Sequence, residues 1–174
     1  KTRKPPFLTL LVSGGHTQIV FVEEWGSYQL LGTTIDDAAG EAFDKLSRFC
    51  GFGCPGGPAI QKIGEGGDPS KIELPRPKTK HAYNYSFSGL KTAATNFLNN
   101  LDIDDKVTRA DFAASYQEAI VDSLLSNFVK AVKDTGVKSI SGGGGVMANS
   151  RLREKMNIFA EEKELNIYLP TPKL

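Results

Sequence analysis

The period of the hydrophobic pattern changes at Asp36, and this change constrains the fold more than any other feature of the sequence. Before Asp36, apolar runs at 7–12 and 17–22 predict two strands, and the glycine-containing segment 13–16 between them predicts a tight hairpin turn. A third strand is expected at 28–32. After Asp36, apolar residues recur three and four positions apart, which is typical of amphipathic helices. The chain therefore begins as a three-stranded meander and then switches from sheet to helix.

Helical spacing of apolar residues predicts four helices in the middle of the chain. The first has Asp36 or Asp37 as its N-cap, and the last begins at Thr108 in a segment that resembles a capping box. Between them, a loop-like stretch rich in Gly and Pro holds a short helix. The four helices are expected between Asp36 or Asp37 and Gly51, at 58–63, at 90–101 and at 108–134.

The C-terminal part of the chain has the pattern of a βαβ unit. A strand is expected at 137–141, a glycine loop at 142–145, a helix at 148–161 and a strand at 166–169. Because a helix between two strands allows them to run parallel, this unit predicts a parallel pair with a right-handed crossover. Together with the meander, it predicts an α/β fold class with one mixed sheet and flanking helices.

Charge and composition exclude several classes of protein. The 21 Lys+Arg and 20 Asp+Glu leave a net charge of +1, which does not suit a protein that grips nucleic acid by bulk charge alone. Hydrophobic residues make up 40% of the chain, and no apolar run approaches the roughly 20 residues of a membrane-spanning helix. We therefore expect a soluble, cytoplasmic protein in which Cys50 and Cys54 are reduced thiols rather than zinc ligands.

Two glycine clusters suit phosphate or nucleotide binding, and each has a simpler alternative. In Ser-Gly-Gly-His at 13–16, the missing Cβ atoms let backbone N–H groups approach an anion, but the segment also suits an ordinary hairpin turn. The loop at 142–145 joins a strand to a helix, where α/β proteins bind nucleotides, although it matches neither the dinucleotide-binding nor the P-loop motif. Asn149, at the start of that helix, is either a ligand contact or an N-cap.

Asp37, Glu41 and Asp44 share one face of the first predicted helix, because they lie at positions i, i+4 and i+7. Carboxylates there can accept hydrogen bonds from ribose hydroxyls or hold a metal-bound water, whereas the alternative is a solvated helix face. Nearby, Cys-Pro-Gly-Gly-Pro at 54–58 either lets the backbone approach a sugar or ends a helix. Neither segment decides between its alternatives alone.

Taken in order, six segments of the chain resemble one family. They are Ser-Gly-Gly-His-Thr-Gln at 13–18, Asp-Asp-Ala-Ala-Gly-Glu-Ala-Phe-Asp-Lys at 36–45, Pro-Gly-Gly-Pro at 55–58, Phe-Ser-Gly-Leu-Lys-Thr at 87–92, Ala-Ser-Tyr-Gln at 114–117 and Gly-Gly-Val-Met-Ala-Asn-Ser-Arg-Leu-Arg at 144–153. Together they resemble the bacterial TsaD family of enzymes that make threonylcarbamoyladenosine in tRNA. The resemblance runs over essentially the whole chain.

The resemblance implies an actin-like ATPase (ASKHA, ribonuclease H-like) fold of two related lobes, with residues 1–174 forming one lobe, mostly the C-terminal one. It also implies transfer of a threonylcarbamoyl group from threonylcarbamoyl-AMP to the adenosine next to the anticodon, in tRNAs that read codons beginning with A. The nucleotide-binding residues that it implies are Leu11, Val12, Ser13, Gly14 and Gly15 at the phosphates, Asp44 and Gly57 at the ribose or adenylate, and Asn149 at the glycine loop.

The family's catalytic metal, Fe²⁺ or Zn²⁺, is expected to bind outside this sequence. The resemblance implies a His-x-x-x-His segment before Lys1 and an Asp-Asn-Gly segment after Leu174 as the sources of its ligands. The sequence also lacks an initiator Met and ends without a closing helix. We therefore expect a piece of a longer enzyme, inactive by itself and without an assignable catalytic residue, whose nucleotide ligand is ATP or threonylcarbamoyl-AMP.

The partners that the resemblance implies are tRNA, a paralogous actin-fold subunit (TsaB-like) and a small P-loop ATPase (TsaE-like), with no membrane. A candidate tRNA surface is the Pro-rich loop, where basic residues alternate with aromatic ones that can stack on anticodon bases. The alternative is a solvated basic loop packed by its own aromatic residues. The residues concerned are Lys71, Arg76, Lys78, Lys80, His81 and Lys91, with Tyr83, Tyr85 and Phe87.

Three other functions are weaker alternatives. A sugar or acetate kinase of the same fold would share the glycine turns but not the segment at 87–92. A non-catalytic paralogue would be expected to lose the nucleotide motifs that this chain keeps. A metalloprotease would need a His-Glu-x-x-His motif, which the sequence lacks.

Overall fold

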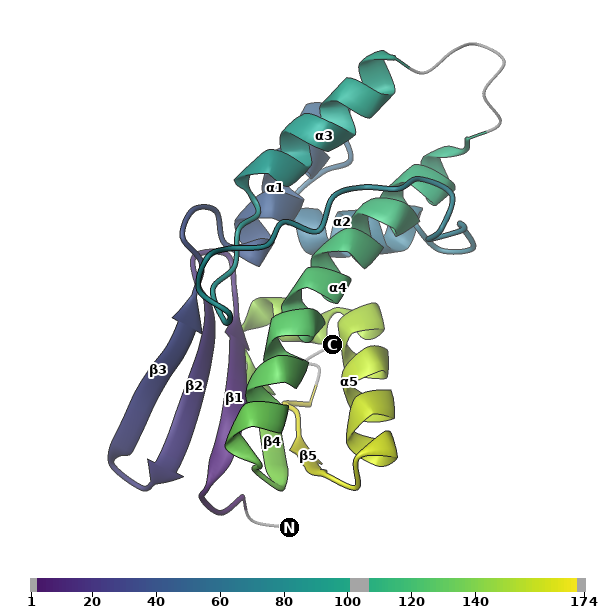
Figure 1. Cartoon of the computed structure of the whole chain (residues 1–174). Helices are drawn as coiled ribbons and strands as arrows, with labels where there is room; N and C mark the ends of the chain where they lie inside the picture. The colour runs from purple at the N-terminus through teal and green to yellow at the C-terminus, as the bar shows by residue number, and fades with distance from the viewer. Residues whose placement is uncertain (1–2, 101–106, 172–174) are drawn as a thin grey trace.

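A computed structural model describes residues 3–100 and 107–171 as an α/β fold of two layers (Figure 1). In chain order, its elements are β1 (Phe7–Val12), β2 (Thr17–Glu24), β3 (Ser27–Thr33), α1 (Ala39–Cys50), α2 (Gly56–Ile63), α3 (Ser88–Asn99), α4 (Arg109–Thr135), β4 (Ser139–Gly143), the short 3-10 helix η1 (Gly145–Ala148), α5 (Ser150–Glu162) and β5 (Asn166–Tyr168).

The strands form one mixed sheet with the order β3-β2-β1-β4-β5. The β1–β2 and β2–β3 pairs are antiparallel, with Phe7 opposite Val22, and β1–β4 and β4–β5 are parallel, with Leu8 opposite Ile140. Helix α4 lies in front of the sheet and α5 stands beside it at the β5 edge, whereas α1, α2 and α3 gather beyond the end at which β1 and β4 finish (Figure 1). The predicted meander and the predicted parallel unit are both confirmed.

The four predicted helices of the middle segment are present as α1 to α4. The capping box at the start of α4 is confirmed, because Thr108 accepts a hydrogen bond from the Asp111 N–H and Asp111 accepts one from the Thr108 N–H, both at 3.0 Å. Leu101, the last residue of the predicted third helix, lies outside the described residues. None of the helices in the described part of the chain is long and apolar enough to cross a membrane.

The predicted N-cap of α1 is wrong, because the N-cap position belongs to Ala38 rather than to Asp36 or Asp37. The Asp36 carboxylate instead accepts hydrogen bonds from the Phe87 and Ser88 N–H groups, at 2.8 and 3.2 Å, at the start of α3. Asp37 pairs with Lys45 at 2.6 Å. Neither acid therefore caps α1, because Asp36 binds the distant start of α3 and Asp37 pairs with a lysine of α1 itself.

The glycine run at 142–145 is not one loop. Gly142 and Gly143 continue β4 and pair with Leu10 and Leu11 of β1, so the turn begins only at Gly144. Gly144 has a φ of +91°, and a Cβ at this position would lie 2.2 Å from the Val12 carbonyl oxygen. Positive φ and close backbone approach both require glycine here. The chain then forms η1, so α5 begins at Ser150 and not at 148 as predicted.

The hydrophobic core lies between the sheet and α4 and extends to α1. Two buried tyrosines on this core donate their hydroxyl groups to backbone carbonyls: Tyr116 to Ala42 at 2.8 Å and Tyr85 to Leu124 at 3.0 Å. Burial raises the pKa of both phenols, so each remains a hydrogen-bond donor at neutral pH. These bonds join α4 to α1 and to the loop before α3.

A chain of ion pairs holds α5 against α4. Glu118 pairs with Arg151 at 2.8 Å and also with Lys155, and Lys155 continues to Asp122 at 2.6 Å. Arg76, from the Pro-rich loop, pairs with the other oxygen of Asp122 at 2.8 Å. The side chain of Glu118 is only 11% exposed, so this network is partly screened from water.

Opposing effects act on the pKa of Glu118. Burial alone would raise it, but the hydrogen bonds from Arg151 and Lys155 outweigh burial and lower it below its ordinary value. The pKa of Asp122 is lowered in the same way, with Lys155 and Arg76 outweighing burial. Because these pKa values are lowered in the folded state, the network stabilises the fold above the ordinary range of carboxylate pKa values. That contribution is lost as the pH falls through the lowered values.

We predict that Glu118→Gln lowers the free energy of unfolding at pH 7 by about 1–3 kcal/mol, because Arg151 and Lys155 each lose a charged partner. Denaturant unfolding of both proteins from pH 7 to pH 3 measures this, and the difference should shrink as wild-type Glu118 is protonated. Glu154→Gln is the matched control, since Glu154 pairs with Arg151 at the exposed rim and should contribute far less. A difference for Glu118→Gln that stays constant with pH would contradict the prediction.

Candidate functional site

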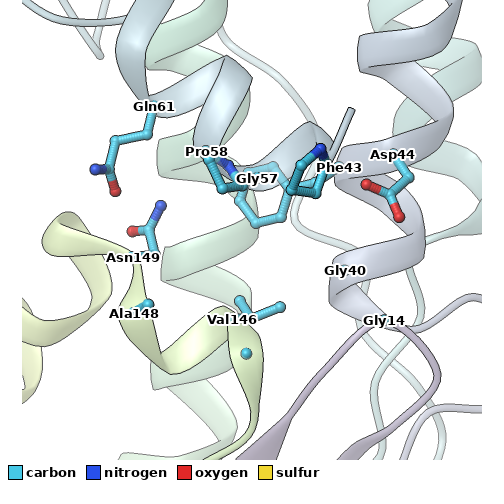
Figure 2. A pocket seen from close by; sticks show the side chains of 12 residues that line it. Gly14, Gly40, Phe43, Asp44, Gly57, Pro58, Gln61, Val146, Ala148 and Asn149 are labelled. Carbon is cyan, nitrogen blue, oxygen red and sulfur yellow. The ribbon is translucent and has the colours of Figure 1, made fainter. Parts of the chain in front are cut away.

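A pocket of about 460 Å³ lies where the carboxyl ends of β1 and β4 meet the helices beyond the sheet (Figure 2). Its walls come from the β1–β2 turn, α1, the start of α2, and the η1–α5 junction. Asp44 and Asn149 lie on opposite sides of it (Figure 2). The lining residues are Gly14, Gly40, Phe43, Asp44, Pro55, Gly57, Pro58, Gln61, Gly145, Val146, Ala148 and Asn149.

The β1–β2 turn is closed by its own serine. Ser13 accepts a hydrogen bond through its hydroxyl from the His16 N–H at 3.0 Å, and the Ser13 N–H donates to the His16 carbonyl at 2.8 Å. Gly14 and Gly15 are exposed at the tip. The hydrogen bonds within the segment are those of an ordinary tight turn. They also place the backbone of its glycines at the edge of the pocket.

The first turn of α1 packs directly on this hairpin. The Gly40 N–H donates to the Ser13 carbonyl at 3.1 Å, and the Ala39 N–H donates to the buried Thr17 hydroxyl at 2.9 Å. A Cβ on Gly40 would lie 2.5 Å from the Ser13 carbonyl oxygen. Only glycine allows this approach, which brings the positive end of the α1 dipole next to the turn.

Of the three acids predicted on one helix face, only Asp44 lines the pocket. Its carboxylate accepts a hydrogen bond from the Gly56 N–H at 2.6 Å and so positions the start of α2. Asp37 and Glu41 instead both bind Lys45, at 2.6 and 3.0 Å. The hydrogen bonds to Asp37 and Glu41 raise the pKa of Lys45, which keeps this cation charged. The solvated-face alternative thus holds for Glu41 alone, because Asp37 precedes α1 and its side chain is only 16% exposed.

Asn149 is an N-cap that also lines the pocket. Its side-chain oxygen accepts a hydrogen bond from the Leu152 N–H at 3.0 Å, and its amide nitrogen donates to the Gln117 side chain at 2.7 Å. The neighbouring Ser150 N–H donates to Gln61 of α2 at 2.8 Å. The start of α5 is therefore held by side chains from two other helices.

Four of the eight predicted nucleotide-site residues line this one pocket: Gly14, Asp44, Gly57 and Asn149. Ser13 and Gly15 belong to the same turn as Gly14. Leu11 and Val12 lie in β1, where Val12 is fully buried and can reach a ligand only through its backbone. The structure thus brings together segments that lie more than a hundred residues apart in the chain.

The sequence did not predict most of the apolar residues that line the pocket. They are Phe43 in α1, Pro55 just before α2, Pro58 in α2 and Val146 in η1. The spacing of Phe43 predicts a core residue, and it is indeed buried, so only its position beside Gly57 marks it as part of the wall. Gln61 carried no sequence signal. A glycine inside an alanine-rich helix start was the one available signal for Gly40.

No group of three or more His, Cys, Asp or Glu side chains within residues 3–100 and 107–171 could hold a metal ion. Cys50 and Cys54 are free thiols. The described residues therefore do not fit the metal that the resemblance implies, and its ligands remain a prediction about segments outside this sequence.

The proposed aromatic stacking surface for tRNA is wrong for two of its three members. Tyr85 and Phe87 are 2% and 1% exposed and stack on each other with ring centroids 6.1 Å apart, so neither can receive a base. Arg76 is paired with Asp122 and also donates to the Leu74 carbonyl. The loop is therefore packed by Tyr85 and Phe87, whereas Tyr83 is half-buried and donates its hydroxyl to Asp134. Besides Arg76, the side chains of the predicted surface that are exposed on this loop are Lys71, Lys78, Lys80 and His81.

Comparison with solved structures defines the fold class. A crystal structure of full-length HypF, in a phosphate- and nucleotide-bound form, matches with a TM-score of 0.71 at 9% sequence identity, over 97% of this chain and 37% of that chain. The HypF structure from T. kodakarensis matches with a TM-score of 0.60 at 16% identity, over 79% and 18% of the two chains. At these identities the likeness shows the fold alone, and the predicted ASKHA-type fold, with its mixed sheet and flanking helices, is confirmed.

Comparison of sequences defines the family. The model of the family described as TsaD, tRNA N6-adenosine threonylcarbamoyltransferase, matches residues 1–174. Proteins described as tRNA N6-adenosine threonylcarbamoyltransferase are 47% identical in Thermosipho africanus and 48% identical in Thermotoga neapolitana, over 96% and 97% of this chain. The chain spans about half the length of these relatives, 51% of each. The chain belongs to the tRNA N6-adenosine threonylcarbamoyltransferase family.

We predict that Gly40→Ala destabilises the protein, because its Cβ would meet rigid backbone of the turn rather than a movable side chain. Overpacking of this kind costs about 1–3 kcal/mol of unfolding free energy. Gly89→Ala in α3 is the matched control: nothing lies within 4 Å of its Cβ, so the change should be neutral or stabilise the helix by up to about 1 kcal/mol. Chemical unfolding of both variants measures this, and equal effects would show that α1 does not depend on the close contact.

Proposed function

We propose that the whole protein transfers a threonylcarbamoyl group from threonylcarbamoyl-AMP to the N6 amine of the adenosine next to the anticodon, in tRNAs that read codons beginning with A. In this proposal the 174 residues form one lobe, mostly the C-terminal one, of a two-lobed cytoplasmic enzyme. The observation that carries it is the convergence of Gly14, Asp44, Gly57 and Asn149 on one pocket in a chain of this family.

The chemistry of the pocket supports an adenosine nucleotide as its ligand. Its phosphates would lie at the Gly14–Gly15 turn, where backbone N–H groups and the α1 dipole favour negative charge. Its ribose would bind Asp44, because a carboxylate accepts hydrogen bonds from two adjacent hydroxyls. Its base would lie among apolar atoms of Phe43, Pro58 and Val146. The HypF structure of the same fold, a phosphate- and nucleotide-bound form, gives independent support.

The remaining requirements of the reaction fall outside the described residues. A divalent metal, Fe²⁺ or Zn²⁺, would polarise the carbamoyl carbonyl as a Lewis acid, and its ligands would come from segments beyond this sequence. The role proposed for this lobe is to bind and orient the nucleotide portion of threonylcarbamoyl-AMP. The proposed partners are tRNA, a paralogous actin-fold subunit and a small P-loop ATPase.

Asp44→Asn in the full-length protein should weaken ATP binding about tenfold, because loss of the charge weakens the hydrogen bonds to ribose. Asparagine keeps an acceptor oxygen for the Gly56 N–H, so the start of α2 should stay in place. Asp37→Asn is the control, since Asp37 lies two residues before the same helix and pairs with Lys45 outside the pocket. Isothermal titration measures the affinities, and equal affinity in wild type and Asp44→Asn would remove Asp44 from the site.

A second prediction separates the lobe from the enzyme. The full-length protein, supplied with its partner proteins, metal, threonylcarbamoyl-AMP and tRNA, should form threonylcarbamoyladenosine, whereas the 174-residue chain alone should form none above background. Mass analysis of nucleosides from digested tRNA measures both. Modification of tRNA by the isolated chain would refute the proposal that this chain binds the nucleotide but cannot catalyse transfer alone. Nucleotide binding without transfer by the full-length protein would favour a non-catalytic nucleotide-binding subunit.

A further inference from the structure

The orientation of the Asn149 side chain follows from a backbone group that can only donate. The Leu152 N–H requires an acceptor, so the atom 3.0 Å from it must be the Asn149 amide oxygen. The Asn149 amide nitrogen then faces Gln117, whose nearest atom, at 2.7 Å, must be an oxygen. The Leu152 N–H therefore fixes the orientation of the Asn149 amide, and the Asn149 amide in turn fixes that of the Gln117 amide.

Gln117 lies on α4 between two residues that are bound to other helices. Its neighbour Tyr116 is fully buried and bonds to the Ala42 carbonyl of α1. Its other neighbour, Glu118, is held by Arg151 and Lys155 of α5. The backbone of Gln117 is thus fixed from both sides, and its side chain reaches Asn149 from a rigid base.

The bond to Gln117 uses one of the two N–H groups of the Asn149 amide, and among the described residues no hydrogen bond uses the second. Asn149 lines the pocket, and its side chain extends toward the α2 wall beside Gln61 (Figure 2). Because the Asn149 side-chain oxygen already caps α5, the group that remains for a pocket ligand is the second N–H, which is a donor.

We propose that Gln117 is a positioning residue of the nucleotide site, which holds the Asn149 amide so that its second N–H points at a hydrogen-bond acceptor of the bound adenosine nucleotide. A ring nitrogen or a ribose oxygen is the class of atom that this donor recognises. The inference rests on the proposed function, because it assumes that the pocket binds such a nucleotide. Gln117 itself touches no ligand in this arrangement and acts only through Asn149.

The test is a double-mutant cycle on ATP affinity in the full-length protein, measured by isothermal titration. Gln117→Leu removes the acceptor and should weaken binding about five- to tenfold, the effect of one neutral hydrogen bond. Gln117→Glu keeps an acceptor oxygen and should stay within about twofold of wild type. Asn149→Ala should weaken binding at least as much as Gln117→Leu. Adding Gln117→Leu to Asn149→Ala should weaken binding no further, because its route to the ligand is already gone.

A stability control separates positioning from folding. Asn127 lies on the same helix and its amide donates to the Asn84 carbonyl at 2.7 Å, far along α4 from the pocket residues. Asn127→Leu should lower the melting temperature about as much as Gln117→Leu but leave ATP affinity unchanged. Equal loss of affinity in both variants, or additive losses in the double mutant, would overturn the positioning role.

The outcomes also separate this inference from the proposed function. If wild type binds ATP and Asn149→Ala weakens it while Gln117→Leu does not, the nucleotide site stands and the role of Gln117 is refuted. If wild type binds neither ATP nor threonylcarbamoyl-AMP, the proposed function fails first, and the role of Gln117 fails with it.

Discussion

The parallel pairing of β1 with β4 is the contact on which the rest of the structure depends. These strands lie more than a hundred residues apart in the chain, yet Leu8 is paired with Ile140 and a hydrogen bond of 2.6 Å joins the side chains of Thr9 and Ser141. Because parallel strands finish at the same edge of a sheet, their two glycine turns meet there. Gly144 completes this contact, since any side chain would collide with the Val12 carbonyl.

The sequence was informative where local chemistry decides the structure. The hairpin, the four helices, the capping box at Thr108 and the βαβ unit all follow from hydrophobic period and turn residues, and all were confirmed. Errors arose where a distant partner competed with a local one. Asp36 has the chemistry of an N-cap for α1, but the N–H groups at the start of α3 bind it instead. Gly142 and Gly143 have low strand propensity, but pairing with β1 keeps them in β4.

In the candidate site too, the sequence predicted what local motifs determine and missed what distant packing determines. Motif resemblance could predict Gly14, Asp44, Gly57 and Asn149, because each lies in a segment with a distinctive order of residues. It could not show that Asp37 and Glu41 turn away to Lys45, since both alternatives have the same helical spacing. Nor could it show the burial of Tyr85 and Phe87, because an aromatic residue among lysines looks the same whether it faces solvent or the core. These distinctions depend on three-dimensional packing, which residue spacing does not encode.

Three consecutive residues of α4 contact three different places. Tyr116 contacts α1, Gln117 contacts the start of α5, and Glu118 contacts basic residues further along α5. Successive side chains on a helix point about 100° apart, so all three contacts can form together in only one rotation of the helix about its axis. A single residue inserted between Thr108 and Tyr116 would rotate the capped start of α4 by about 100° relative to these three contacts. We therefore expect relatives to vary in length in the connections outside α4 but not between Thr108 and Glu118, where the length of the helix fixes the relative rotation of these contacts.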